Sequence, residues 1–103
     1  MDDAALLRAA ADRIDELAAR TTGGTWTTRG LLASRPEVVA GWPDGSTEHV
    51  AEARARTAAW ISTLSPALAG PLAGWLRAEA AGPADPHALA VARLVVDGPA
   101  ATV

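Results

Sequence analysis

The chain of 103 residues contains no cysteine, no lysine, no phenylalanine and no tyrosine. Without cysteine it can form no disulfide, no thiolate-ligated zinc site and no iron–sulfur cluster, and it has no thiol nucleophile. Without lysine it cannot build the phosphate-binding loop motif, which requires one. Composition alone therefore excludes several classes of enzyme and of metal protein.

Long apolar runs are absent as well. No apolar stretch approaches the roughly 18–20 residues that a membrane-spanning helix requires. The chain begins Met1-Asp2-Asp3, which is acidic where a secretion signal needs basic residues. We therefore expect a cytoplasmic protein that does not enter a membrane.

Basic residues are few and are all arginine: nine of them face 12 acidic residues, for a formal net charge of −3. Nucleic-acid affinity depends on concentrated basic side chains that release counterions from phosphates. Such a surface is not indicated, so nucleic acid is not an expected partner.

Half of the residues are hydrophobic, but 26 of them are alanine, which leaves 25 larger apolar side chains for the interior. Burying one large apolar side chain contributes roughly 1.5–3 kcal/mol, while ordering a residue costs about 1–2 kcal/mol. The predicted core is thin. Association with a partner or with a second copy would supplement it.

Apolar side chains that recur every three or four residues predict helices in four parts of the chain. The first covers residues 3–20, where Leu7, Ala10, Ile14 and Leu17 share one face. A second helix is expected after the Pro43-Asp44-Gly45 turn, from an N-cap at Ser46 or Thr47 to about Leu64.

The third and fourth helices are each predicted to begin with a capping residue followed by proline. These pairs are Ser65 with Pro66 and Asp85 with Pro86, and the fourth helix is expected to end at Asp97. Pro71 interrupts the third pattern. Either the first turn is separate there or the helix kinks.

Residues 25–42 favour β structure and predict a short antiparallel hairpin or three-stranded meander. Trp26 and Trp42 lie at its two ends as anchors and are candidate interface residues. Trp60 and Trp75 fall on the apolar stripes of their helices, which predicts that both lie in the core.

The expected fold class is α+β and mostly α: a bundle of about four helices with a short β element between helix 1 and helix 2. A single domain is expected over residues 1–98, with its β insert at about 25–42. Residues 99–103 are expected to be a flexible tail.

The densest polar cluster is Asp44, in the turn, with Glu48, His49 and Glu52, which stand at helical spacing on the expected second helix. It could hold a metal ion or an acid–base pair, but metal sites normally need three converging ligands. An acidic first turn that complements the helix dipole, with Arg56 paired to Glu52, explains it more simply. No metal and no cofactor are expected.

His87 follows Asp85-Pro86 at the start of the expected fourth helix and is a further candidate for catalysis with His49. A surface position for each histidine is the simpler interpretation. No nucleophile motif such as G-x-S-x-G is present.

The segment Thr22-Gly23-Gly24-Thr25-Trp26, with Ser65-Pro66-Ala67, Leu72-Ala73 and Trp75-Leu76 further on, resembles a group of short uncharacterised actinobacterial and actinophage proteins. In that group a leading helix runs into T-P-G-P-W, then strands, then an alanine-rich helix. The resemblance covers most of the chain. It implies an accessory role and provides no catalytic residues to transfer.

The leading functional prediction is a non-enzymatic interaction module that docks another protein or associates with itself. One alternative is a small metal-dependent or acid–base enzyme that uses Glu48, His49 and Glu52, with His87 as a further residue. Another is a DNA-binding regulator built on the second and third helices.

Overall fold

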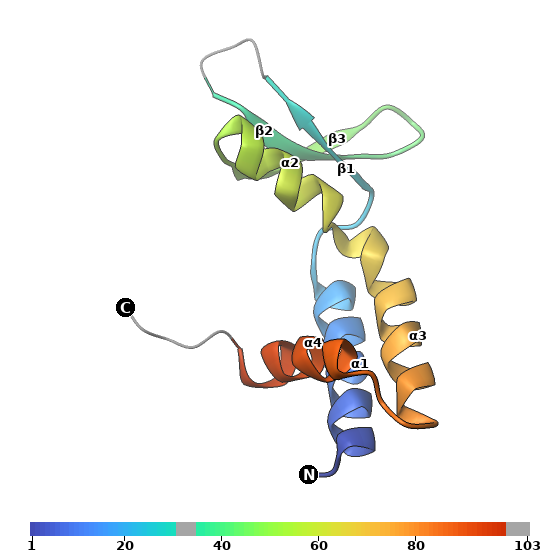
Figure 1. Cartoon of the computed structure of the whole chain (residues 1–103). Coiled ribbons are helices and arrows are strands. Elements are labelled where there is room, and N and C mark those ends of the chain that lie inside the picture. The colour runs from blue at the N-terminus through green and yellow to red at the C-terminus, as the bar shows by residue number, and fades with distance from the viewer. Residues whose placement is uncertain (31–34, 99–103) are drawn as a thin grey trace. The chain divides into compact units, whose positions relative to one another are not determined.

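The computed structural model of the protein describes residues 1–30 and 35–98. Along the chain the elements are α1 (Asp3–Arg20), β1 (Thr25–Arg29), β2 (Glu37–Gly41), β3 (Thr47–Glu52), α2 (Ala55–Thr63), the 3₁₀ helix η1 (Pro66–Leu68), α3 (Ala69–Ala80) and α4 (Pro86–Asp97). The α+β class is confirmed, with a three-stranded antiparallel meander between α1 and the later helices (Figure 1). The tail predicted for residues 99–103 and the β-favouring pair Leu31-Leu32 lie outside the described residues.

The chain divides into two compact units. Unit 1 contains α1, α3 and α4, and unit 2 comprises Thr21–Leu68, with the sheet, α2 and η1. The single domain expected over residues 1–98 stays a prediction.

Unit 1 is built around α1, which packs against both α3 and α4 (Figure 1). Its fully buried residues are Leu7, Ala10, Ala11, Ala73, Leu76, Ala88 and Ala92. Small side chains at these contacts let the helices approach closely. The expected bundle of about four helices is wrong: in the described ranges three helices form it, and α2 packs on the sheet.

The predicted starts of α1 and α4 are confirmed in their capping contacts. The Asp2 carboxylate accepts the Ala5 N–H at 2.7 Å, and the Asp85 carboxylate accepts the His87 N–H at 2.6 Å. Pro86 occupies the first turn of α4, where the missing N–H costs nothing because that group has no helical partner. Local sequence therefore determines both helix starts.

Of the two alternatives at Pro71, the separate first turn is confirmed. The turn at Pro66–Leu68 is a separate 3₁₀ helix, and α3 begins at Ala69, so that Pro71 lies within its first turn. An N–H at that position would have no partner in the helix, and proline is tolerated there.

A charged contact joins α3 to α1 in unit 1. The Arg77 guanidinium donates to Asp12 at 2.9 Å and to Asp15 at 2.7 Å. These two hydrogen bonds, Asp15 first, raise the pKa of Arg77 above its usual range. Because all three side chains are well exposed, the contact orients the helices more than it stabilises them.

In unit 2, α2 covers one face of the sheet (Figure 1). Val38 and Ala40 lie on the covered face and are fully buried, and their β1 partners Thr28 and Trp26 are half-buried. Ala58 of α2 is also fully buried. The core of this unit, like that of unit 1, includes fully buried alanines.

The second helix does not begin at Ser46 or Thr47. Residues 42–46 close a hairpin instead: the Gly45 N–H donates to the Trp42 carbonyl at 2.9 Å, and the Trp42 N–H to the Ser46 carbonyl at 3.0 Å. Gly45 has a φ of +85°, which glycine adopts without strain. An Asp-Gly pair between β-favouring runs is typical of a hairpin, so the β element extends to Glu52 rather than ending at about 42.

The expectation that Trp60 and Trp75 are core residues is wrong. Trp60 is 68% exposed and Trp75 is 39% exposed. Because α2 begins only at Ala55, its sheet-facing side is set by the buried Ala58, and a residue two positions later points about 200° away. In α3 the buried positions are Ala73 and Leu76.

The alanine packing of unit 1 predicts that the same Ala→Leu substitution changes the free energy of unfolding very differently at two positions of α3. Ala73→Leu forces a larger side chain into the α1 contact and should lower the free energy of unfolding by roughly 1–3 kcal/mol. Ala78→Leu changes an exposed position of the same helix and should be nearly neutral. Urea unfolding followed by circular dichroism measures both, and equal stabilities would contradict the packing described.

Candidate functional site

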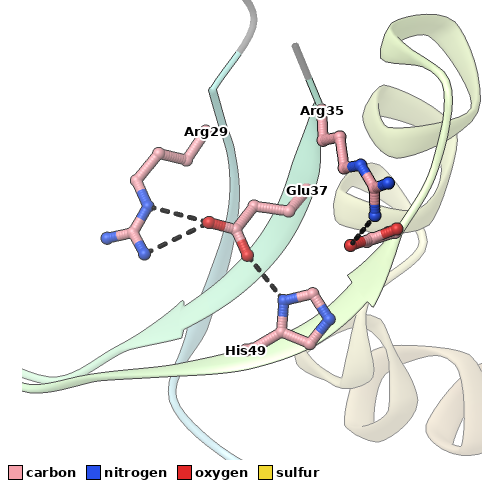
Figure 2. A network of polar contacts seen from close by, with 5 residues as sticks. Arg29, Arg35, Glu37 and His49 are labelled. Atoms are coloured by element: carbon pink, nitrogen blue, oxygen red, sulfur yellow. Dashed lines mark hydrogen bonds and ion pairs between the residues drawn. The ribbon is translucent and has the colours of Figure 1, made fainter. Parts of the chain in front are cut away.

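The most connected polar group lies on the sheet face opposite α2 and is centred on Glu37. One carboxylate oxygen of Glu37 accepts from the Arg29 Nε at 3.3 Å and Nη2 at 3.2 Å, and the other contacts the His49 Nδ1 at 2.5 Å. Figure 2 shows the carboxylate between the guanidinium and the imidazole. We call Arg29, Glu37 and His49 the strand triad, because each comes from a different strand.

Strand register brings the triad together. Glu37 is directly opposite Arg29 on β1 and Glu52 on β3, and Val39, two residues along β2, is opposite His49. The β2–β3 register shifts at Val38/Val39, which gives β3 one extra residue. His49 and Glu52, three apart, would otherwise point to opposite faces; the bulge places both on the face of Glu37.

The charges of the triad support one another. The hydrogen bond from His49 is the largest cause of the lowered pKa of Glu37; burial, the next largest, opposes it, and the contacts with Arg29 lower the pKa further. In the neutral imidazole, donation of Nδ1–H to the carboxylate would leave Nε2 of His49 as a proton acceptor. This arrangement orients a base, but the His49 side chain is 54% exposed, so bulk water competes for its partners.

The predicted cluster of Glu48, His49 and Glu52 lies on β3 and not on a helix, which corrects the expected placement. His49 and Glu52 share a face, whereas Glu48 pairs with Ala40 on the other one. Glu52 contacts Arg35 at 3.4 Å rather than Arg56, so the expected Glu52–Arg56 pair is wrong.

His87, the other candidate histidine, does not join the strand triad, and no metal site is found among the described residues. His87 belongs to unit 1, in the first turn of α4, and His49 to unit 2. Among residues 1–30 and 35–98 no group of three His, Asp or Glu side chains could hold a metal ion. Arg29 and Glu37, which complete the triad, were not predicted, because only strand register places them beside His49.

The interface candidates Trp26 and Trp42 differ in exposure. The half-buried Trp26 donates its Nε1–H to the carbonyls of Thr22 at 3.2 Å and Gly23 at 3.3 Å. Trp42 is 36% exposed and, with Pro43, Asp44 and Ser46, lines a shallow surface depression. Trp42 is therefore the more accessible of the two.

The turn beside this depression is held by Asp44. Its Oδ1 accepts from the Ser46 hydroxyl at 2.6 Å and from the Ser46 N–H at 2.9 Å. These hydrogen bonds lower the pKa of Asp44. The carboxylate is thus occupied in shaping the hairpin.

Comparisons of the chain with protein-family models, with curated proteins and with solved structures give no match. Within the described ranges, no helix has the length and apolar character needed to cross a membrane.

The lowered pKa of Glu37 predicts a pH dependence of stability. Because the folded pKa lies below the ordinary 4.5, the carboxylate stabilises the fold above that pH, and the contribution is lost as pH falls through the folded pKa. Glu37→Gln should therefore be less stable than the wild-type protein at neutral pH, and the difference should shrink on acidification below about 4.5.

Urea midpoints measured across this pH range test the effect. Glu48→Gln removes one negative charge from the opposite face of the same sheet and is the matched control. If Glu37→Gln and Glu48→Gln follow the same pH profile, the triad does not stabilise the sheet.

Gly24 packs closely against Trp42, which predicts that alanine is tolerated at Gly23 but not at Gly24. Gly24 has a φ of +76°, and a Cβ there would lie 2.9 Å from the Gly41 carbonyl oxygen and 3.0 Å from Trp42 Cε2. Gly24→Ala should lower the free energy of unfolding by at least about 1–2 kcal/mol. Gly23→Ala meets nothing within 4 Å and should be tolerated. The melting temperatures of the two variants test this. If Gly24→Ala is as stable as Gly23→Ala, Gly24 does not pack closely against Gly41 and Trp42.

Proposed function

We propose that the protein is a non-enzymatic interaction module whose docking surface is the outer side of α2. The observation that carries this proposal is Trp60, a large apolar side chain that is 68% exposed. Leu64 follows one turn later at 47% exposure, so the two share one side of the helix. Exposed tryptophan is enriched at the energetic centres of protein interfaces.

The charges beside Trp60 and Leu64 favour an acidic partner. Arg54 precedes α2, Arg56 lies in its first turn one turn before Trp60, and the helix contains no acidic residue. The ion pairs of the described residues involve neither arginine. A helical segment that combines apolar side chains with carboxylates complements this surface, in the manner of an amphipathic helix docking on a groove or face.

The alternatives have less support. An acid–base enzyme would use His49 with Glu37 as its orienting carboxylate, since Glu48 lies on the other face, but this pair is open to water. A DNA-binding regulator would read bases with α3, whose one basic residue, Arg77, is bound to Asp12 and Asp15. An accessory role of the kind implied by the actinobacterial and actinophage resemblance is compatible with a docking module.

A selection of peptides tests the proposal. A library of random peptides displayed on phage is selected on the wild-type protein, and the enriched sequences are expected to carry net negative charge and apolar residues at helical spacing. Trp60→Ala should weaken the best of them by about 30-fold, the effect of losing an interface residue worth about 2 kcal/mol. Arg56→Glu should weaken them as well, and added salt should reduce the wild-type affinity.

Trp75→Ala is the matched control, because it removes an exposed tryptophan from unit 1. Enriched peptides that bind the Trp60→Ala variant as well as the wild-type protein would overturn the docking surface. Enrichment of neutral or basic peptides would overturn the assigned chemistry of the partner.

A further inference from the structure

The strand β1 lies at an edge of the sheet. The strand order is β1-β2-β3, and within the described residues β1 pairs only with β2. An edge strand presents a row of unpaired N–H and C=O groups, which can pair with a strand from another chain. This surface is separate from the outer side of α2.

The two edges of the sheet differ in how well they resist such pairing. The register of β3 is interrupted by a bulge, and β3 carries the charged or titratable side chains of Glu48, His49 and Glu52. Bulges and charges of this kind normally protect an edge. On these grounds β3 is the protected edge.

β1 lacks these devices. Its five residues, Thr-Trp-Thr-Thr-Arg, pair with β2 without interruption and include no proline and no carboxylate. Threonine and tryptophan favour strands. Its one charged side chain, Arg29, donates to Glu37 of β2, so its charge is already paired within its own sheet.

We infer that β1 pairs antiparallel with β1 of a second copy of this chain. All five residues pair only if Thr27 lies opposite Thr27 of the copy, which places Thr25 opposite Arg29 and Trp26 opposite Thr28. This register sets no two like charges directly opposite one another, and it makes a threonine pair at the two-fold axis, a favourable cross-strand combination. The strand is therefore self-complementary, as a symmetric dimer interface must be.

The pairing would also stabilise unit 2, whose sheet is small. A sheet of three short strands is near the lower limit for independent stability, and the residues it buries are valines and alanines. Joining two copies gives one continuous sheet of six strands and removes the exposed β1 edge. The inference does not depend on the function proposed for α2.

Sedimentation equilibrium of the whole chain at micromolar to submillimolar concentration tests this register. The wild-type mass should rise from that of one chain towards that of two. Thr25→Lys sets two symmetric like-charge pairs against Arg29 of the copy and should weaken the dimer by about 2- to 30-fold, whereas Thr25→Glu should tighten it by a similar factor. Thr25 is exposed, so neither change disturbs the monomer core.

Thr47→Lys and Thr47→Glu make the same changes at an exposed position of β3 and should leave the dimer unchanged. A wild-type chain that stays monomeric throughout overturns the inference. So does equal weakening by Thr25→Lys and Thr25→Glu, or a dimer that responds to Thr47 and not to Thr25. Loss of the dimer in Trp60→Ala with no response to Thr25 would assign self-association to α2 and overturn pairing through β1.

Discussion

Most of the buried side chains in the described part of this protein are small, and much of its structure follows from that constraint. Of the eleven buried hydrophobic residues in the described part of the chain, seven are alanine. Helices that meet at alanine can approach to about 8 Å between their axes, and the contact then has no room for a larger side chain. Several large apolar residues are left on the solvent side instead, as Trp60 and Leu94 are at 68% and 60% exposure. The surface proposed for docking is thus the counterpart of the alanine packing.

The two faces of the sheet in unit 2 also differ, one being buried and the other polar. The face under α2 buries Val38 and Ala40, whereas the other face carries the strand triad. Contacts between exposed charges contribute little net free energy in water. They do select a register, however, because a slip of β1 by one residue would move Arg29 to the face covered by α2 and away from Glu37. The triad therefore acts chiefly to align three strands, and it pairs the one charge of β1 within its own sheet.

What the sequence could predict depended on how local the determining interaction is. The helix over Asp3–Arg20, the Asp85-Pro86 start of α4 and the presence of a β meander rest on neighbouring residues, and all three are confirmed. The helix predicted over Thr47–Glu52 is wrong. Glu48, His49 and Glu52 fit helical spacing, and only the pairing of this segment with β2 makes it a strand. The triad was missed for the same reason: Arg29, Glu37 and His49 are distant in sequence, and a bulge determines which residues of β3 join them. Trp60 was predicted to be buried because the expected helix began at about residue 46. The observed α2 begins at Ala55 and turns Ala58, not Trp60, toward the sheet.

The two proposed surfaces have a joint consequence, because antiparallel edge pairing relates the copies by an axis perpendicular to the sheet. Residues opposite one another in such a pair share a face, so both α2 helices would cover one face of the six-stranded sheet and both triads the other. Two copies of the Trp60 surface would then be presented on the same side. A partner with two matching segments would meet the second one at high effective concentration and gain avidity without any new contact. Modest affinity at each surface, which a single exposed tryptophan and its neighbours imply, would then suffice for stable attachment.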